Sequence, residues 1–233
     1  MTPGTAIVVA AGSGERLAAG TPKALVAVAG APMLVHSVRA FVQSESISDV
    51  VVVLPPGADF DHIRPLLRQV GAPDAALLEG GATRQESVSR GLEASPPRTG
   101  LIAIHDAARP LVSARLIDRT VAALVPPWDA VAPGIPVADT LKLVDHTRQA
   151  VLRTVDRQGL WQVQTPQVFA RITLERVHAR IAPAADAATD DLSLVERAGG
   201  RVRLIEGERR NLKVTVPEDL VLAEQLLAAG AAP

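Results

Sequence analysis

A glycine-rich turn near the N-terminus is the first candidate site for phosphate chemistry. Gly12 and Gly14 follow the apolar run Thr5 to Ala10, and Arg16 and Lys23 lie in the same connection. Backbone amides of such a turn can approach a phosphate at the carboxyl end of a strand. Two cations there would suit phosphoryl or nucleotidyl transfer, in which charge accumulates on phosphate oxygens. Two basic side chains without any other signal are more often exposed to solvent with no binding role. The neighbouring glycines are therefore what favours a phosphate-binding site here.

Two common phosphate-binding motifs do not fit this turn. Leu17 stands where a dinucleotide-binding fingerprint has its third small residue, and the Gly-Lys-Ser or Gly-Lys-Thr of a P-loop does not follow. The sequence therefore supports neither hydride transfer with a dinucleotide nor P-loop ATPase chemistry.

A second glycine pair precedes a predicted helix. Gly80 and Gly81 come shortly before Arg84, and Ser87 lies one turn into the helix. Glycines at this point leave backbone amides free to contact a base or a phosphate. The alternative is that the pair only makes a tight turn.

Two more charged residues lie beside predicted elements, Asp106 after a strand and Lys213 before a helix. Asp106 ends the strand predicted at residues 101–105, and a carboxylate beside a phosphate site is a candidate Mg²⁺ ligand. A helix cap or a local ion pair explains such an aspartate equally well. Lys213 precedes the last predicted helix, where it could also be a solubilising charge. The five histidines show neither metal-ligand spacing nor a serine partner, which favours structural roles for them.

The composition limits the classes of partner. The chain has 233 residues, a formal net charge of -1 and no cysteine. Basic residues form no long run, so we expect neither nucleic acid nor a membrane surface as partner, and a small molecule is the default. Disulfides and thiolate chemistry are excluded, and a reducing cytoplasm is compatible with that. No apolar run reaches the roughly 18 residues that span a bilayer, and the first residues do not resemble a secretory signal. We expect a soluble cytoplasmic protein.

The candidate residues must be positioned by a regular alternation of strands and helices. Short apolar runs predict strands, and apolar residues at three- and four-residue spacing predict helices between them. Because the strands are apolar throughout, both faces of their sheet should be covered by helices, which predicts a mainly parallel three-layer α/β/α fold. The predicted strands are 5–10, 50–54, 101–105 and 130–135, and the predicted helices are 32–42, 60–70, 84–93, 114–124, 170–181 and 217–229. The whole chain, 1–233, is expected to form one domain.

The alternation stops at about residues 137–156, where two apolar runs flank a polar turn. This pattern predicts a β-hairpin arm. An isolated hairpin is marginal in water, so the arm should lie against something else. Packing on its own domain and packing on a second copy of the chain remain equally open at this point.

Seven blocks, taken together, carry a resemblance over essentially the whole length. They are AAGSGERLAAGTPKAL, GGATRQESV, HDAARP, VADTLK, TVDRQGLWQVQTPQ, TDDLSLVE and NLKVTVPEDLVLAE. In this order and spacing the chain resembles the 2-C-methyl-D-erythritol 4-phosphate cytidylyltransferase family of the non-mevalonate isoprenoid pathway. That family is similar to other Rossmann-like nucleotide-diphospho-sugar transferases and joins CMP from CTP to its acceptor with Mg²⁺, releasing pyrophosphate.

The resemblance implies a role for each matching residue. Arg16, Lys23 and Lys213 would stabilise charge on the α-phosphate, with Arg157 also at the reaction centre. Asp106 would sit near the ribose and the metal. The acceptor pocket would use Thr140, Arg157, Arg109, Thr165 and Asp106, with the first two on the arm of the partner subunit in a homodimer. The residues implied at the nucleotide are Ala10, Ala11, Gly12, Gly14, Gly81, Arg84, Ser87, Asp106 and Ala107.

Two departures and two alternative functions accompany this resemblance. Ala82 stands where relatives often carry a polar residue, and Leu192 where they often carry a small one. The chain has no room for the cyclodiphosphate synthase domain fused to some relatives, so we expect a monofunctional enzyme.

Ribitol 5-phosphate cytidylyltransferases share the first loop and would change only the acceptor. A regulatory module that binds nucleotide without turnover is a further alternative, which the presence of all three cations disfavours.

Overall fold

The structure is a computed structural model that describes residues 4–12, 21–145, 147–148, 150–180 and 190–229. Its helices are the short 3-10 helix η2 (Lys23–Leu25) and the α-helices α1 (Met33–Gln43), α2 (Phe60–Gln69), α3 (Arg84–Ala94), α4 (Ala114–Ala122), α5 (Arg171–His178), α6 (Asp191–Arg197) and α7 (Pro217–Ala228). The strands are β1 (Gly4–Val9), β2 (Ala27–Val28), β3 (Ala31–Pro32), β4 (Ile47–Leu54), β5 (Ala76–Glu79), β6 (Leu101–Asp106), β7 (Ala130–Pro136), β8 (Leu141–Val144), β9 (Val151–Val155), β10 (Trp161–Val163), β11 (Gln167–Ala170) and β12 (Val202–Glu206).

The main sheet has eight strands in the described part of the chain, and most of them are parallel. β1 lies between β4 and β6, and β5 pairs with the far side of β4, all in parallel. β11 runs antiparallel between β6 and β7, and β10 is antiparallel to β7. β12 pairs with β7 in parallel. The predicted mainly parallel sheet is confirmed, and the carboxyl ends of β1, β4, β5 and β6 meet at one edge.

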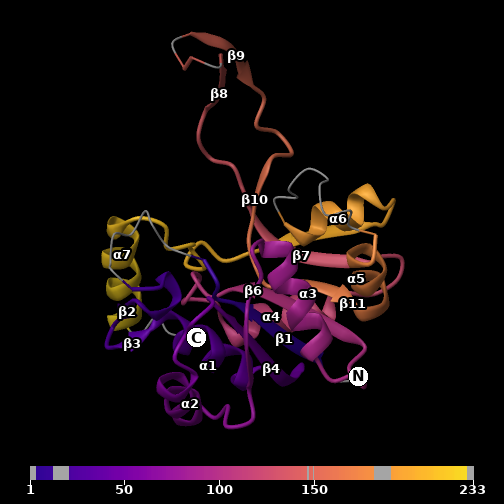
Figure 1. Cartoon of the computed structure of the whole chain (residues 1–233). Coiled ribbons are helices and arrows are strands. Elements are labelled where there is room, and N and C mark those ends of the chain that lie inside the picture. The colour runs from indigo at the N-terminus through magenta and orange to yellow at the C-terminus, as the bar shows by residue number, and fades with distance from the viewer. Residues whose placement is uncertain (1–3, 13–20, 146, 149, 181–189, 230–233) are drawn as a thin grey trace.

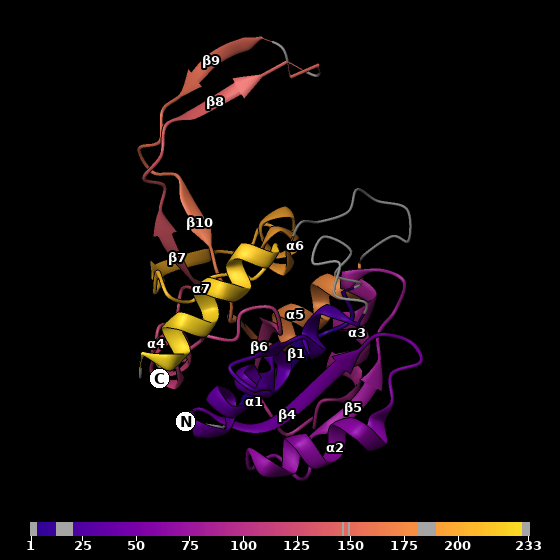
Figure 2. The same ribbon diagram turned by 90° about the vertical axis from the view of Figure 1, so that its left-hand side faces the viewer.

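The central strands are buried on both faces because helices cover both (Figure 2). On β1, Ala6 and Val8 point into a cluster with apolar residues of α1, α2 and α4. Ile7 points the opposite way, into a cluster with residues of α3, α5 and α6. Each buried branched or aromatic side chain contributes about 1.5–3 kcal/mol relative to exposure. This two-sided burial explains why the strands are apolar throughout instead of alternating.

Side-chain caps fix where several helices begin. The Thr83 side chain accepts a hydrogen bond from the Glu86 amide at the start of α3. Asp190 does the same for the Ser193 amide at the start of α6. Replacing such a cap by alanine typically costs about 1 kcal/mol. The Thr83 cap matters for the site, because α3 begins at Arg84, three residues after the second glycine pair ends.

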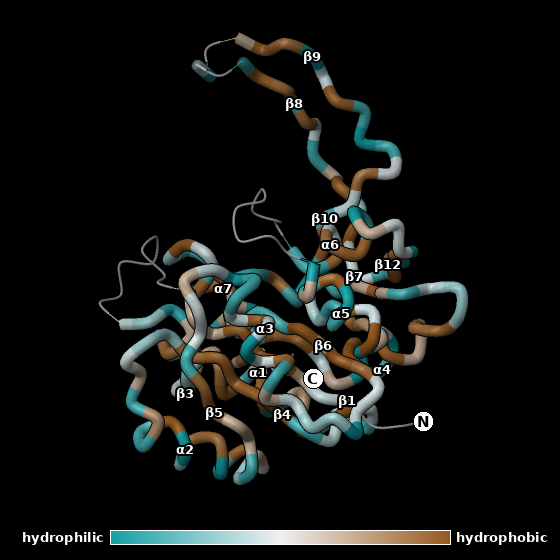
Figure 3. Tube along the Cα trace, turned by 45° about the vertical axis from the view of Figure 1, so that its right-hand side comes forward, coloured by the Kyte–Doolittle hydropathy of each residue, from teal (hydrophilic) through white to brown (hydrophobic). Residues whose placement is uncertain are grey.

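The predicted arm, residues 137–156, stands away from the body of the molecule (Figure 1). β8 and β9 pair antiparallel within it, which confirms the hairpin. The arm's apolar residues are brown in Figure 3, and β8 and β9 form a two-stranded sheet separate from the main sheet. The most exposed are Leu143 at 44%, Val144 at 41%, Val151 at 60% and Leu152 at 60%. The alternative in which the hairpin packs on its own domain is therefore wrong, and a second copy of the chain remains a prediction.

The chain beyond the arm contains elements that the periodicity did not predict, namely β10, β11, α6 and β12, and β5 was also missed. Among the described helices, none is both long enough and apolar enough to cross a membrane.

Candidate active site

A pocket of about 710 Å³ opens where the ends of β1 and β6 meet the start of α3. This is the edge of a parallel sheet at which ligands usually bind. Ten residues predicted from the sequence line it: Ala10, Ala11, Gly12, Lys23, Gly81, Arg84, Ser87, Asp106, Ala107 and Lys213. Val9 and Ala24 line it as well, although the sequence analysis did not single them out.

The turn before α3 has glycines because its neighbours leave no space for side chains. A Cβ at Gly80 would lie 2.7 Å from both Ala11 Cβ and Ser87 Oγ. The Gly81 amide donates to Ser87 Oγ at 3.1 Å, and Ser87 Oγ donates to Thr83 O at 2.9 Å. The turn after β5 and the turn after β1 therefore lie in close contact on one wall of the pocket. This arrangement presents backbone together with Thr83 and Ser87 to a ligand.

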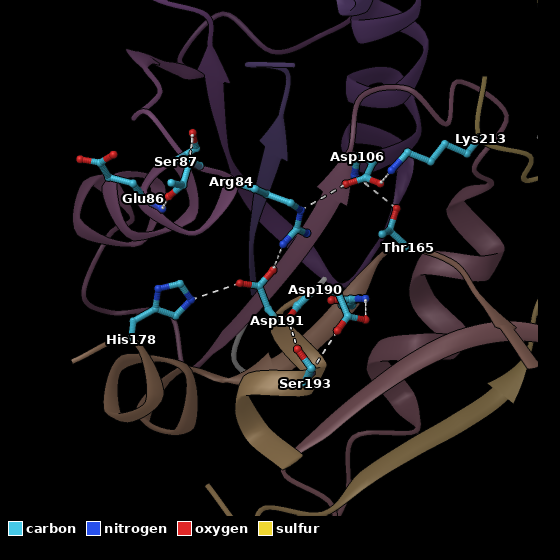
Figure 4. Close-up of polar contacts among 12 residues, drawn as sticks. Arg84, Glu86, Ser87, Asp106, Thr165, His178, Asp190, Asp191, Ser193 and Lys213 are labelled. Atoms are coloured by element: carbon cyan, nitrogen blue, oxygen red, sulfur yellow. Dashed lines mark hydrogen bonds and ion pairs between the residues drawn. The ribbon is translucent and has the colours of Figure 1, made fainter. Parts of the chain in front are cut away.

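Asp106 is the only carboxylate among the described lining residues, and two cations face it (Figure 4). Lys213 Nζ donates to its Oδ2 at 2.7 Å, and Arg84 Nε lies 3.8 Å from its Oδ1. Burial alone would raise the pKa of this carboxyl, but the cations, first Lys213 and then Arg84, outweigh burial and lower the pKa to about 2. Asp106 is thus an anion at any physiological pH.

A chain of hydrogen bonds behind the pocket fixes the Asp106 backbone. The Asp106 amide donates to Thr165 Oγ1 at 3.2 Å, and that oxygen lies 2.8 Å from His105 Nδ1. His105 Nε2 lies 3.3 Å from the carbonyl oxygen of Arg109. Because a carbonyl can only accept, we assign the ring N–H to Nε2, and the Thr165 hydroxyl then donates to Nδ1. His105 also packs edge-on against Phe41, with ring centroids 5.1 Å apart.

This buried imidazole makes stability depend on pH. Burial lowers the pKa of His105 to about 3, whereas an unfolded histidine titrates near 6.5. The unfolded chain therefore binds a proton that the folded chain excludes, so stability is fully present above pH of about 6.5 and falls as pH drops toward 3. We expect His105 to account for a loss of about 2 kcal/mol in the free energy of unfolding between pH 7 and pH 5.

Urea unfolding at the two pH values tests this expectation. The His105→Asn variant should lose that much less stability on acidification than the unchanged protein. The matched control is His62→Asn, because His62 is exposed on α2; it should keep the original pH dependence. Equal pH dependence in His105→Asn and the unchanged protein would contradict the assignment.

The segment that carries Lys213 is held at both ends. Asn211 is fully buried and its Nδ2 donates to Thr165 O at 2.8 Å. The Val214 amide donates to Ala108 O at 2.8 Å. Beyond it, the Asp219 carboxylate on α7 accepts from the Thr215 amide and hydroxyl at 2.7 and 2.8 Å. These contacts place Lys213 at the pocket although it follows Asp106 by 107 positions.

A second lysine reaches the pocket from the N-terminal side. Lys23 is the first residue of η2 and lines the pocket. Gly14 and Arg16 lie outside the described residues, so one predicted glycine and the third predicted cation are not placed. Two ammonium groups and one carboxylate therefore define the charge of the described pocket wall, together with the Arg84 guanidinium.

The residues that the resemblance implied for the acceptor divide into two groups. Thr165 contacts Asp106, and Arg109 lies behind it, 9% exposed, with Nη1 donating to Asn211 O at 2.8 Å and Nη2 to Val163 O at 3.2 Å. Thr140 and Arg157 are exposed on the arm or at its base. There the Arg157 Nη1 donates to Ala138 O. The structure thus places Thr165 and Arg109 behind Asp106 in the same chain, buried and outside the lining of the described pocket, and leaves Thr140 and Arg157 on the arm or at its base, away from the pocket.

Two ionisable residues that the sequence analysis did not single out, Asp191 and His178, lie behind Arg84. Asp191 at the start of α6 contacts the Arg84 guanidinium, and His178 at the end of α5 contacts Asp191 (Figure 4). The pair of aspartates before an apolar run at residues 192–195 is a helix-start signal that could have predicted α6. Nothing in the local sequence indicates that Asp191 reaches Arg84.

A mainly parallel α/β sheet, with a glycine turn and lysines at its carboxyl edge, defines a nucleotide-binding α/β protein. Within that class, this chain belongs to the 2-C-methyl-D-erythritol 4-phosphate cytidylyltransferase (IspD) family, whose model matches residues 5–229.

Sequence and structure comparisons agree on this family. A 2-C-methyl-D-erythritol 4-phosphate cytidylyltransferase of Streptomyces coelicolor is 45% identical, over 96% of this chain and 84% of the relative. The crystal structure of the enzyme of that name from Thermus thermophilus has a TM-score of 0.78 at 38% identity and covers 98% of this chain and 100% of that one. A 4-diphosphocytidyl-2C-methyl-D-erythritol synthase from Anaerococcus prevotii superposes with a TM-score of 0.84 at 27% identity, covering 97% and 96% of the two chains.

Proposed function

We propose that this chain transfers CMP from CTP to 2-C-methyl-D-erythritol 4-phosphate, giving 4-diphosphocytidyl-2-C-methyl-D-erythritol and pyrophosphate. The observation that carries the proposal is the convergence of Lys23, Lys213 and Asp106 with the two glycine turns in one pocket. Family membership supplies the identity of the substrates.

In the proposed reaction, an oxygen of the acceptor phosphate attacks the α-phosphorus of CTP. The bond from that phosphorus to the bridging oxygen of the leaving group breaks, and pyrophosphate takes the electron pair. Charge grows on the oxygens around the α-phosphorus during this step, and fixed cations stabilise it. We assign that role to Lys23 and Lys213, with Arg16 as the third cation, and we assign the cytidine pocket to Ser87 and the two glycine turns.

The acceptor is proposed to bind between two subunits. Thr165 and Arg109 lie beside Asp106 in one chain. Thr140 and Arg157 are exposed on the arm, which does not pack on its own body. We therefore propose a homodimer in which the arm of the partner subunit brings these two side chains to the acceptor phosphate. The exposed apolar residues of the arm support such an association.

We propose Mg²⁺ as the divalent cation that accompanies CTP. No group of three or more candidate ligand side chains occurs among the described residues. Mg²⁺ usually takes one or two carboxylates together with substrate phosphates, and the single Asp106 carboxylate at the pocket fits that pattern. When bound, the cation would neutralise charge on the phosphate oxygens, with Asp106 as its protein ligand.

We also propose that the enzyme works in the cytoplasm as a single catalytic domain. The sequence contains no cysteine, which suits a reducing compartment. The two main apolar clusters lie on opposite faces of one sheet and share strand β1, which supports one folding unit.

An acceptor comparison tests the function. The purified protein is incubated with CTP, Mg²⁺ and either methylerythritol phosphate or ribitol 5-phosphate, and released pyrophosphate is measured. We expect a much higher kcat/KM with methylerythritol phosphate, and weaker turnover when ATP, GTP or UTP replaces CTP. Faster turnover of ribitol 5-phosphate would support the alternative acceptor, whereas CTP binding without turnover of either would support a regulatory module.

A further inference from the structure

Asp191 is a buried carboxylate to which the proposed reaction assigns no part. Its exposure is 0%. Placing a charged group in the interior costs several kcal/mol unless partners compensate for the lost water. An apolar side chain would fill this core position at a lower cost in free energy than a carboxylate. The groups that contact Asp191 therefore indicate the role of its charge.

Both carboxylate oxygens of Asp191 have such partners. Oδ2 lies 2.5 Å from Arg84 Nη1, and Oδ1 lies 3.2 Å from His178 Nε2. Burial would raise the pKa of this carboxyl, but the hydrogen bond from His178 and the charge of Arg84 outweigh burial and lower the pKa. Asp191 therefore stays ionised and presents its charge to Arg84 from behind the pocket.

Arg84 lies between two carboxylates that compete for it. Its Nη1 is within hydrogen-bonding distance of Asp191, whereas its Nε is 3.8 Å from Asp106, beyond a hydrogen bond. The other carboxylate oxygen of Asp106, Oδ2, accepts a hydrogen bond from Lys213 Nζ at 2.7 Å. Asp191 thus determines how close the guanidinium comes to Asp106. Without that anchor, Arg84 would be drawn onto Asp106, the strongest remaining negative charge nearby.

We propose that Asp191 is a positioning residue for nucleotide binding, which holds the Arg84 guanidinium at the pocket wall and keeps it from closing on Asp106. The inference rests on the proposed cytidylyl transfer. Arg84 is the first residue of α3, lies three residues after Gly81 of the glycine turn assigned to the nucleotide, and lines the pocket with it. The larger effect is therefore expected on CTP, because Asp106 is the only proposed acceptor contact with a described ion pair to Arg84.

The test removes the Asp191 charge and keeps its shape. Asp191→Asn is expected to raise the KM for CTP, and the Kd for CTP in a binding titration, by about tenfold, because small displacements of a binding group have effects of that order or larger. The KM for methylerythritol phosphate should stay within about twofold. A general loss of structure would affect both substrates, so it would not raise the KM for CTP while leaving the KM for methylerythritol phosphate almost unchanged.

Asp190→Asn is the matched control, because it removes the same charge from the adjacent position. The Asp190 carboxylate caps α6 and accepts a hydrogen bond from Gln167 Nε2 at 2.8 Å; its charge acts on Arg84 more weakly than that of Asp191, and no hydrogen bond or ion pair joins the two described side chains. The control variant should leave the KM for CTP near its original value, and the asparagine oxygen can still cap α6. Equal KM values for CTP in the two variants would overturn the proposal.

A double-substitution cycle supplies a second measurement. If Asp191 acts through Arg84, Arg84→Gln with Asp191→Asn should bind CTP as weakly as Arg84→Gln alone. This comparison does not need a folded Asp191→Asn, because Arg84→Gln still leaves Asp191 its contact with His178 and the double variant removes both charges of the pair. A further large loss of affinity in the double variant would contradict the proposal. If the protein without any substitution released no pyrophosphate from CTP and methylerythritol phosphate, the proposed function itself would be refuted.

Discussion

Replacing Lys23 by alanine is expected to lower kcat by about 10²–10³-fold while the Kd for CTP changes by less than about threefold. Lys23 lines the pocket at the start of η2, together with Gly12 and Gly81 of the two glycine turns. In our proposal its ammonium group interacts most strongly with charge that develops at the α-phosphorus during transfer. An interaction made mainly in the transition state affects the rate and contributes little to ground-state binding. Single-turnover rates and a CTP titration measure the two quantities separately.

Two further variants complete this experiment. Lys23→Arg keeps the charge in a different geometry and should recover part of the lost rate. Arg68→Ala removes an exposed cation of α2 away from the pocket, and its kcat should not change. If Lys23→Ala weakened CTP binding as much as it slowed turnover, Lys23 would be a ground-state contact and its assigned role would be wrong.

The sheet could be predicted because burial on both faces leaves a strong local signal. Residues 50–54 of β4 and 101–105 of β6 are apolar or small almost throughout, and the helices between the strands carry apolar residues at regular spacing. Elements with weaker signals were missed. β12 carries charged residues at positions 203 and 206 and is only partly buried, and β5 has four residues. The arm was found because its polar turn interrupts two apolar runs.

The site could be predicted residue by residue but not as an arrangement. The glycine turns, Asp106 and Lys213 were each found from local sequence, with ordinary structural explanations left open. Their convergence depends on contacts between distant segments, such as Lys213 with Asp106 and Arg84 with Asp191, 107 positions apart in both cases. Spacing along the chain gives no indication of such pairs. Only the resemblance to a known family brought the first pair together, and the second emerged from the structure alone.

Mixing two inactive variants is the most direct test of the shared active site. Lys23→Ala removes a cation from the pocket of one chain, and Arg157→Ala removes a cation from its arm. Each homodimer should have little activity, because every site would lack one of the two groups. Subunit exchange in an equal mixture makes half of the dimers mixed, and each mixed dimer holds one site with both groups intact. The expected activity is about a quarter of that of the unchanged protein.

The control for this experiment is a mixture of Lys23→Ala with Lys213→Ala. Both lysines line the pocket of the same chain, so a mixed dimer of these two variants has no intact site and should recover no activity. Arg157 differs because it is exposed at the base of the arm, where its Nη1 donates to Ala138 O and not to a residue of the pocket. Recovery in both mixtures would point to exchange artefacts. Failure of the Arg157→Ala mixture to recover would mean that each pocket uses only the residues of its own chain.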